Sequence, residues 1–146
     1  MEKLCSVYGE RVIIILWSGL DEVQFIEQIA VHYDITVNAG SGFIIADAKA
    51  FVDGLSRRVR AGLPAPWLLS LSGFTNLVDL FQTLFEWNDD RDGQAIFKFM
   101  ESLDTADPCW QRTIDINILE AATEHGVQAV SLQALCIFGA GIGLFN

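Results

Sequence analysis

A hydrophobic composition combined with a strong negative charge limits the folds open to this chain. Of its 146 residues 51% are hydrophobic, yet the formal net charge is −10 at neutral pH. A chain of this size can bury a sizeable core, so we expect a single domain over residues 1–146 with its charges at the surface. The three cysteines show no paired spacing of the kind found in disulfide frameworks, which favours a reducing, cytoplasmic environment.

Much of the negative charge lies in one stretch in the second half of the chain. Between Asp79 and Asp107 there are eight acidic residues and two basic ones. The acidic residues are Asp79, Glu86, Asp89, Asp90, Asp92, Glu101, Asp104 and Asp107. Because such a cluster is expected to form a solvated negative face, it should attract basic proteins and cations and repel nucleic acid.

Within this stretch the turn from Asn88 to Gly93 matches part of a calcium-binding loop. Asn88, Asp90 and Asp92 occupy its first, third and fifth positions, and Gly93 occupies the sixth. The twelfth position, which normally supplies a bidentate glutamate, is Phe99. A hydrophilic turn between two helices explains the same residues. We therefore predict no metal site and no cofactor, and leave open whether this turn binds a cation.

The N-terminal third of the chain predicts a small β-sheet. Arg11–Trp17 is a β-branched run typical of a strand buried on both faces, and Ile35–Val37 and Phe43–Ala46 are shorter strand candidates. The segment Asn38–Gly42 between the last two has the residues of a hairpin turn. A helix capped by Asp21 is expected between the first two strands.

Four further helices are predicted from the helical spacing of apolar residues. They run from Asp47, as N-cap, to Gly62, from Thr75 to Trp87, from Gly93 to Leu103, and from Asp107-Pro108 to His125. Apolar and polar residues also alternate around Ile114–Ile118, as they would in a strand. The segment Gly126–Asn146 is compatible with a buried helix, a strand or a membrane-associated segment. Together, the predicted strands and helices indicate an α+β fold with a small N-terminal sheet and four or five helices.

No set of side chains in the sequence predicts catalysis. The two histidines, His32 and His125, fall near the ends of predicted helices, where positive charge is favourable. Ser70 and Ser72 do not lie in a nucleophile elbow, and the glycine clusters lack the strand–loop–helix context of a phosphate loop. We therefore predict no catalytic residue.

The sequence thus favours a small acidic binding protein. Bacterial immunity proteins and antitoxins have this physical character, which is a likeness of type and not of sequence. We expect it to dock a basic protein partner, such as a toxin or nuclease, by electrostatic attraction. The predicted contact residues are Glu86, Trp87, Asp89, Asp90 and Asp92. Trp87 would supply apolar area, although it also fits the apolar face of its predicted helix.

The alternative is a small-molecule-binding domain or enzyme with an apolar pocket, which requires a closed cavity with convergent polar groups. We expect neither nucleic acid nor a membrane as a partner.

Overall fold

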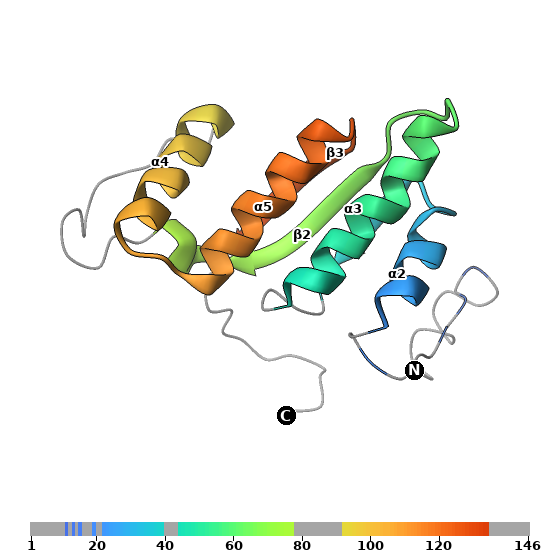
Figure 1. The fold of residues 1–146 in the computed structure, drawn as a ribbon, viewed down its shortest axis with the longest axis horizontal. Helices are drawn as coiled ribbons and strands as arrows, with labels where there is room; N and C mark the ends of the chain where they lie inside the picture. Colours follow the sequence, from blue (N-terminus) through green and yellow to red (C-terminus); the bar gives the residue numbers. More distant parts are fainter. Residues whose placement is uncertain are drawn as a thin grey trace.

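The computed structural model describes residues 22–39, 44–77 and 92–134, together with Arg11, Ile13, Ile15 and Gly19. These residues form a mixed helix–strand fold with three strands and four α-helices (Figure 1). The strands are β1 (Ile35–Asn38), β2 (Trp67–Gly73) and β3 (Gln128–Ala134). The helices are α2 (Val23–Ala30), α3 (Ile45–Arg60), α4 (Gly93–Ala106), α5 (Trp110–Glu124) and the short 3-10 helix η2 (Phe74–Leu77).

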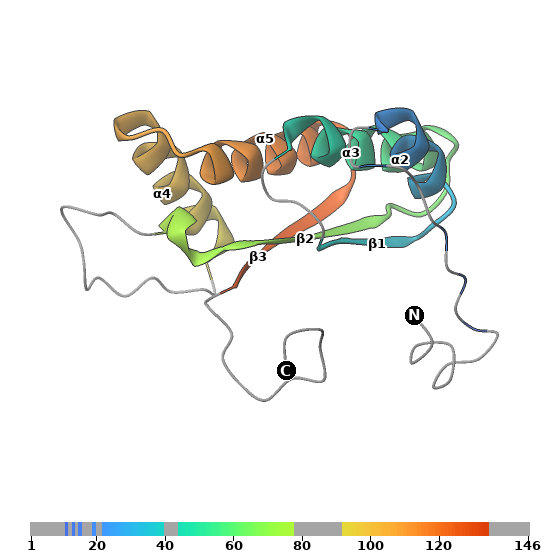
Figure 2. The same cartoon turned by 90° about the horizontal axis from the view of Figure 1, so that it is seen from below.

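The three strands make one parallel sheet in the order β1-β2-β3. Trp67 of β2 stands opposite Ile35 of β1 and Gln128 of β3, which sets the register. Parallel neighbours cannot be joined by a tight turn and need a crossover connection. That connection runs through α3 between β1 and β2, and through α4 and α5 between β2 and β3. Figure 2 shows α2, α3 and α5 side by side on one face of the sheet.

The hydrophobic core lies between this face of the sheet and helices α3 and α5. Its largest buried apolar side chains are Val52 and Leu55 of α3, Ile114 and Ile118 of α5, and Leu68 of β2. Helix α2 packs against α3 at the edge of this core (Figure 1).

The contact between α2 and α3 depends on Gly54. A Cβ atom on Gly54 would lie 2.6 Å from the carbonyl oxygen of Glu27 and 2.9 Å from the Cβ of Ala30. Real Cβ atoms do not approach other heavy atoms so closely, so any larger residue would push the two helices apart.

The two faces of the sheet differ in polarity in an unusual way. Towards the helices β2 and β3 turn the apolar Leu68 and Ala129 in their first half, whereas β1 turns Thr36 there. In their carboxyl half all three strands turn polar side chains towards the helices. The polar ones are Asn38, Ser70, Ser72, Ser131 and Gln133, all buried or half-buried. The opposite face, called the open face below, consists of Ile35, Val37, Trp67, Leu69, Leu71, Gln128, Val130 and Leu132. The carboxyl half of the sheet therefore turns its more polar side towards the helices.

The predicted N-terminal sheet is wrong in its position and pairing. The strands are spread from Ile35 to Ala134, so the sheet is not N-terminal. Ile45 and Ala46 begin α3 instead of ending a hairpin strand, because the alanine-rich sequence that follows favours a helix. Of the predicted strand Arg11–Trp17 the structure describes Arg11, Ile13 and Ile15, and Ile13 is 79% exposed, which contradicts burial on both faces.

Two of the three helices predicted in the second half of the chain are confirmed. Helix α4 begins at Gly93 as predicted and ends three residues later than predicted. Helix α5 begins at Trp110 and not at Pro108, because Asp107 is not its cap. Instead the carboxylate of Asp104 accepts hydrogen bonds from the backbone N–H of Cys109 (3.1 Å) and from Thr113 Oγ1 (2.9 and 3.0 Å).

Other predictions are only partly covered by the described residues. Asp21, the predicted cap of the first helix, lies outside them, and α2 begins after Glu22. The predicted helix from Thr75 to Trp87 is described as far as Leu77, where it is the 3-10 helix η2. The ambiguous segment after Gly126 is a strand as far as Ala134. None of the described helices combines the length and hydropathy needed to cross a bilayer.

Candidate functional site

Of the five predicted partner-binding residues the structure describes one, Asp92. It is the N-cap of α4, and its Oδ1 accepts a hydrogen bond from the backbone N–H of Ala95 at 3.0 Å. A carboxylate at this position also interacts favourably with the positive end of the helix dipole. The other four residues, Glu86, Trp87, Asp89 and Asp90, lie outside the described residues.

Helix α4 carries further carboxylates on its last turns and at its C-cap. Asp92 lies at the other end of α4, about 20 Å from Asp107 by the rise of an α-helix. We call these four residues along α4, Asp92, Glu101, Asp104 and Asp107, the acidic end of the fold. Asp92 and Asp107 are exposed, whereas Glu101 and Asp104 are half-buried. No ion pair involving these four carboxylates is present among the described residues.

The described ion pairs lie on the other side of the molecule. Arg57 pairs with Glu27 and Arg58 with Asp34, which ties α3 to α2 and to the turn after it. Figure 1 shows α2 and α4 at opposite ends of the fold. The negative charge of the acidic end is therefore not neutralised by the arginines of α3.

A buried polar cluster, which the sequence analysis missed, lies between the carboxyl half of the sheet and α5. Its centre is Asp115 of α5, which is 2% exposed. The Oδ2 atom of Asp115 accepts hydrogen bonds from Asn76 Nδ2 (2.6 Å), Ser131 Oγ (2.8 Å) and Gln133 Nε2 (3.0 Å). These donors come from η2 and β3, so one carboxylate joins three elements that are far apart in the sequence.

A second layer of hydrogen bonds supports this cluster. Asn76 is fully buried, and its Nδ2 also donates to Ser72 Oγ at 3.0 Å. Arg112 donates from Nε to the carbonyl oxygen of Asn76 (2.9 Å) and from Nη1 to that of Asp107 (3.0 Å). Two buried amide oxygens, Asn76 Oδ1 and Gln133 Oε1, have no hydrogen-bond partner among the residues that the structure describes. The cluster thus offers two unsatisfied acceptors beside a buried carboxylate.

The position of the cluster is one where folds with parallel strands often bind ligands. Such sites form outside the carboxyl ends of parallel strands, and the cluster lies at the carboxyl ends of β2 and β3. Its chemistry suits a water molecule or a ligand that donates hydrogen bonds. It holds no pair of nucleophile and base, and no described group of three or more histidines, cysteines or acids is arranged to hold a metal ion. The one local signal of it in the sequence is the alternation of polar residues at the ends of the strands, Ser70 and Ser72 in β2 and Ser131 and Gln133 in β3.

A second buried carboxylate, Asp47, lies in the first turn of α3. The N-cap of α3 is Ile44, so the predicted capping role of Asp47 is wrong. Its Oδ1 accepts a hydrogen bond from the backbone N–H of Ala48 at 2.6 Å, whereas its buried Oδ2 has no hydrogen-bond partner in the described part of the chain. Burial raises the pKa of the Asp47 carboxyl above its ordinary value, although the hydrogen bond from Ala48 acts in the opposite direction.

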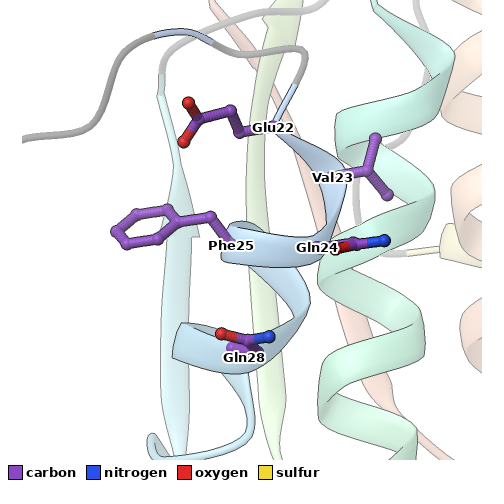
Figure 3. A pocket seen from close by; sticks show the side chains of 5 residues that line it. All are labelled: Glu22, Val23, Gln24, Phe25 and Gln28. Atoms are coloured by element: carbon purple, nitrogen blue, oxygen red, sulfur yellow. The ribbon is translucent and has the colours of Figure 1, made fainter.

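A surface hollow on α2 does not meet the requirements of a small-molecule pocket. It is lined by five consecutive or neighbouring residues of one helix end: Glu22, Val23, Gln24, Phe25 and Gln28. Figure 3 shows Glu22 and Phe25 pointing to one side of the helix, and Val23 and Gln24 to the other. Their polar groups do not converge on a common point, so this hollow is not the cavity that the small-molecule alternative requires.

Comparisons with known proteins assign no family to this chain. No family model matches it, and neither the curated proteins nor the solved structures include a significantly similar chain. The geometry of the acidic end, the polar cluster and the open face is therefore the basis for the functional conclusions.

Proposed function

We propose that this chain is a non-catalytic binding domain that docks a basic protein partner through the acidic end. The supporting observation is that the four carboxylates at α4 have no ion-pair partner in the described part of the chain, while Glu27 and Asp34, which lie beside α3, pair with its arginines. We include Glu86, Trp87, Asp89 and Asp90 in the proposed surface because they precede Asp92 by at most six residues.

In this proposal the charge acts mainly on the rate of encounter. Complementary charges raise association rates by about tenfold to a thousandfold at low ionic strength, and salt screens the effect. Trp87 would add apolar contact area once the partner is docked. An inhibitor of a basic toxin or nuclease would work in this way, by covering the cationic surface of its target in the cytoplasm.

The experiment is affinity capture from the host, followed by kinetics with the purified partner. The test variant carries D92N, E101Q and D107N, which remove three charges from the acidic end. Asp104 is left unchanged, because its carboxylate accepts hydrogen bonds from residues at the start of α5. Asparagine is as good an N-cap as aspartate, so α4 should remain intact. We expect the association rate with the captured partner to fall at least about tenfold at low salt, and its dependence on salt to weaken.

A matched control removes the same charge elsewhere. The substitutions D53N, E120Q and E124Q lie on α3 and α5, outside the acidic end. They should leave the association rate within about twofold of wild type. If both triple variants bind the partner like wild type, or lose binding equally, docking through the acidic end is wrong.

A second candidate function is the binding of a small ligand at the polar cluster. The two unsatisfied acceptors, Asn76 Oδ1 and Gln133 Oε1, favour it. A ligand with hydrogen-bond donors should raise the melting temperature of the wild type and not that of N76A. A thermal-shift screen of small amines, amides and polyols in which no compound stabilises the wild type would count against this candidate.

A further inference from the structure

The open face of the sheet is an apolar surface without a cover among the described residues. Its exposed members come from all three strands: Ile35 (62%), Val37 (62%), Trp67 (42%), Leu71 (42%), Val130 (37%) and Leu132 (45%). The strand register places them in adjacent rows, so they form one continuous patch. Figure 2 shows α2, α3 and α5 on the other side of the sheet.

A parallel sheet with one apolar face in water is exceptional. Parallel sheets are almost always covered on both faces, which is why their strands carry apolar residues on both sides. Here the apolar alternation of β2 and β3 points away from the helices, and the serines point towards them. A surface of this size and polarity marks an interaction site.

We infer that a second copy of this chain covers the open face. None of the eight side chains on this face is ionisable, so two copies can meet there without bringing carboxylates into contact, despite a net charge of −10 on each. A basic partner would find no opposite charge on it. A two-fold axis brings the same patch of each copy together and satisfies both at once.

The area is sufficient for a specific contact. An aromatic side chain has on the order of 150–250 Å² of surface, and Ile, Val and Leu lie near or below the lower limit of this range. Six such side chains that are about half exposed therefore leave roughly 500 Å². Two copies would bury about 1,000 Å² in total, the size at which specific interfaces begin. The two sheets would pack face to face about 10 Å apart, as in β-sandwiches, with Trp67 as the largest anchor. This surface is separate from the acidic end, so the inference does not depend on the proposed function.

The test compares two exposed tryptophans by analytical ultracentrifugation between about 1 and 100 µM. Trp67 lies on the open face, whereas Trp110 is 76% exposed at the start of α5. We expect wild type and W110E to be dimers, and W67E to raise the dissociation constant of the dimer at least about 30-fold. L71K is a second variant on the same face, and circular dichroism of each variant verifies the fold.

Three outcomes would overturn the inference. If the wild-type protein is monomeric at about 100 µM, a second copy does not cover the open face. Either another segment of the same chain covers it or nothing does. A dimer unaffected by both W67E and L71K would use another surface. A dimer that W110E weakens as much as W67E would show a general effect of charge.

Discussion

Replacing Asp115 with asparagine tests the buried polar cluster and its energy. The Oδ2 atom of Asp115 accepts three hydrogen bonds, from Asn76, Ser131 and Gln133, at 2.6, 2.8 and 3.0 Å. Hydrogen bonds to a charged group contribute about 1.5–3 kcal/mol each and neutral ones about 0.5–1.5, so three bonds lose about 3 kcal/mol in total. A neutral amide costs less to bury than a carboxylate, which returns part of this loss. We expect D115N to lower the free energy of unfolding by about 2 kcal/mol.

Urea unfolding followed by circular dichroism measures this difference, and a thermal scan provides a second reading. For a chain of this size about 2 kcal/mol corresponds to a fall of roughly 4–8 °C in melting temperature. The control is E120Q, which removes a carboxylate from the exposed side of the same helix and should change stability by less than about 0.5 kcal/mol. If D115N is as stable as E120Q, the three hydrogen bonds do not hold the sheet to α5 and η2.

Two further predictions concern α3. Burial raises the pKa of Asp47, so the folded state disfavours the ionised form of this carboxyl. The resulting loss of folding stability is absent at pH values below the ordinary pKa of aspartate. It develops as the pH rises from that value through the raised pKa of the folded state. D47N should therefore match wild type in stability near pH 3 and exceed it near pH 7 in urea unfolding; a difference that does not change with pH would contradict this. G54A should lower the free energy of unfolding by about 1–3 kcal/mol, because its Cβ overlaps Glu27 and Ala30. The control is G93A, whose Cβ has no atom within 4 Å and which should not change stability measurably. Equal losses of stability would mean that α2 does not pack closely on α3.

The helices of this fold were predictable because their signals are local. The apolar residues of α3 and α4 recur at helical spacing, and the structure confirms the predicted start of α4 at Gly93 and the predicted stop of α3 at Gly62. The pairing of the strands was not predictable in the same way. Residues Asn38–Gly42 suit a hairpin, yet β1 pairs in parallel with β2, which begins at Trp67. No local pattern specifies a partner that distant.

The candidate sites also differ in how far they can be predicted from local sequence. A cluster of acids such as that around Asp92 is visible in the sequence because charge density is a local property. The polar cluster as a whole is not predictable from the alternation of polar residues in its strands, since Ser72, Asn76, Asp115 and Gln133 come from four elements and meet only in the folded chain. Each of them alone is an ordinary polar residue. The contact role of Asp92 stays a prediction, and so do those of Glu86, Trp87, Asp89 and Asp90, which lie outside the described part of the chain.

The orientation of the sheet connects these observations. Because the strands turn serines and Gln133 towards α5, the polar cluster has its donors, and because they turn leucines and Trp67 away, the open face is apolar. A shift of one residue in any strand would exchange the two faces. Both the buried cluster and the proposed dimer therefore depend on which side of β2 and β3 meets the helices.

Adjacent positions on β2 test this orientation most directly. Leu71 lies on the open face and is 42% exposed, whereas Ser72 is buried beneath the helices and accepts a hydrogen bond from Asn76. In urea unfolding at low protein concentration, where dimers dissociate, L71S should cost less than about 1 kcal/mol and S72L at least about 2 kcal/mol, because leucine overpacks the site and deprives Asn76 of an acceptor. The reverse order, with L71S strongly destabilising and S72L tolerated, would mean that the apolar side of the strand packs against the helices.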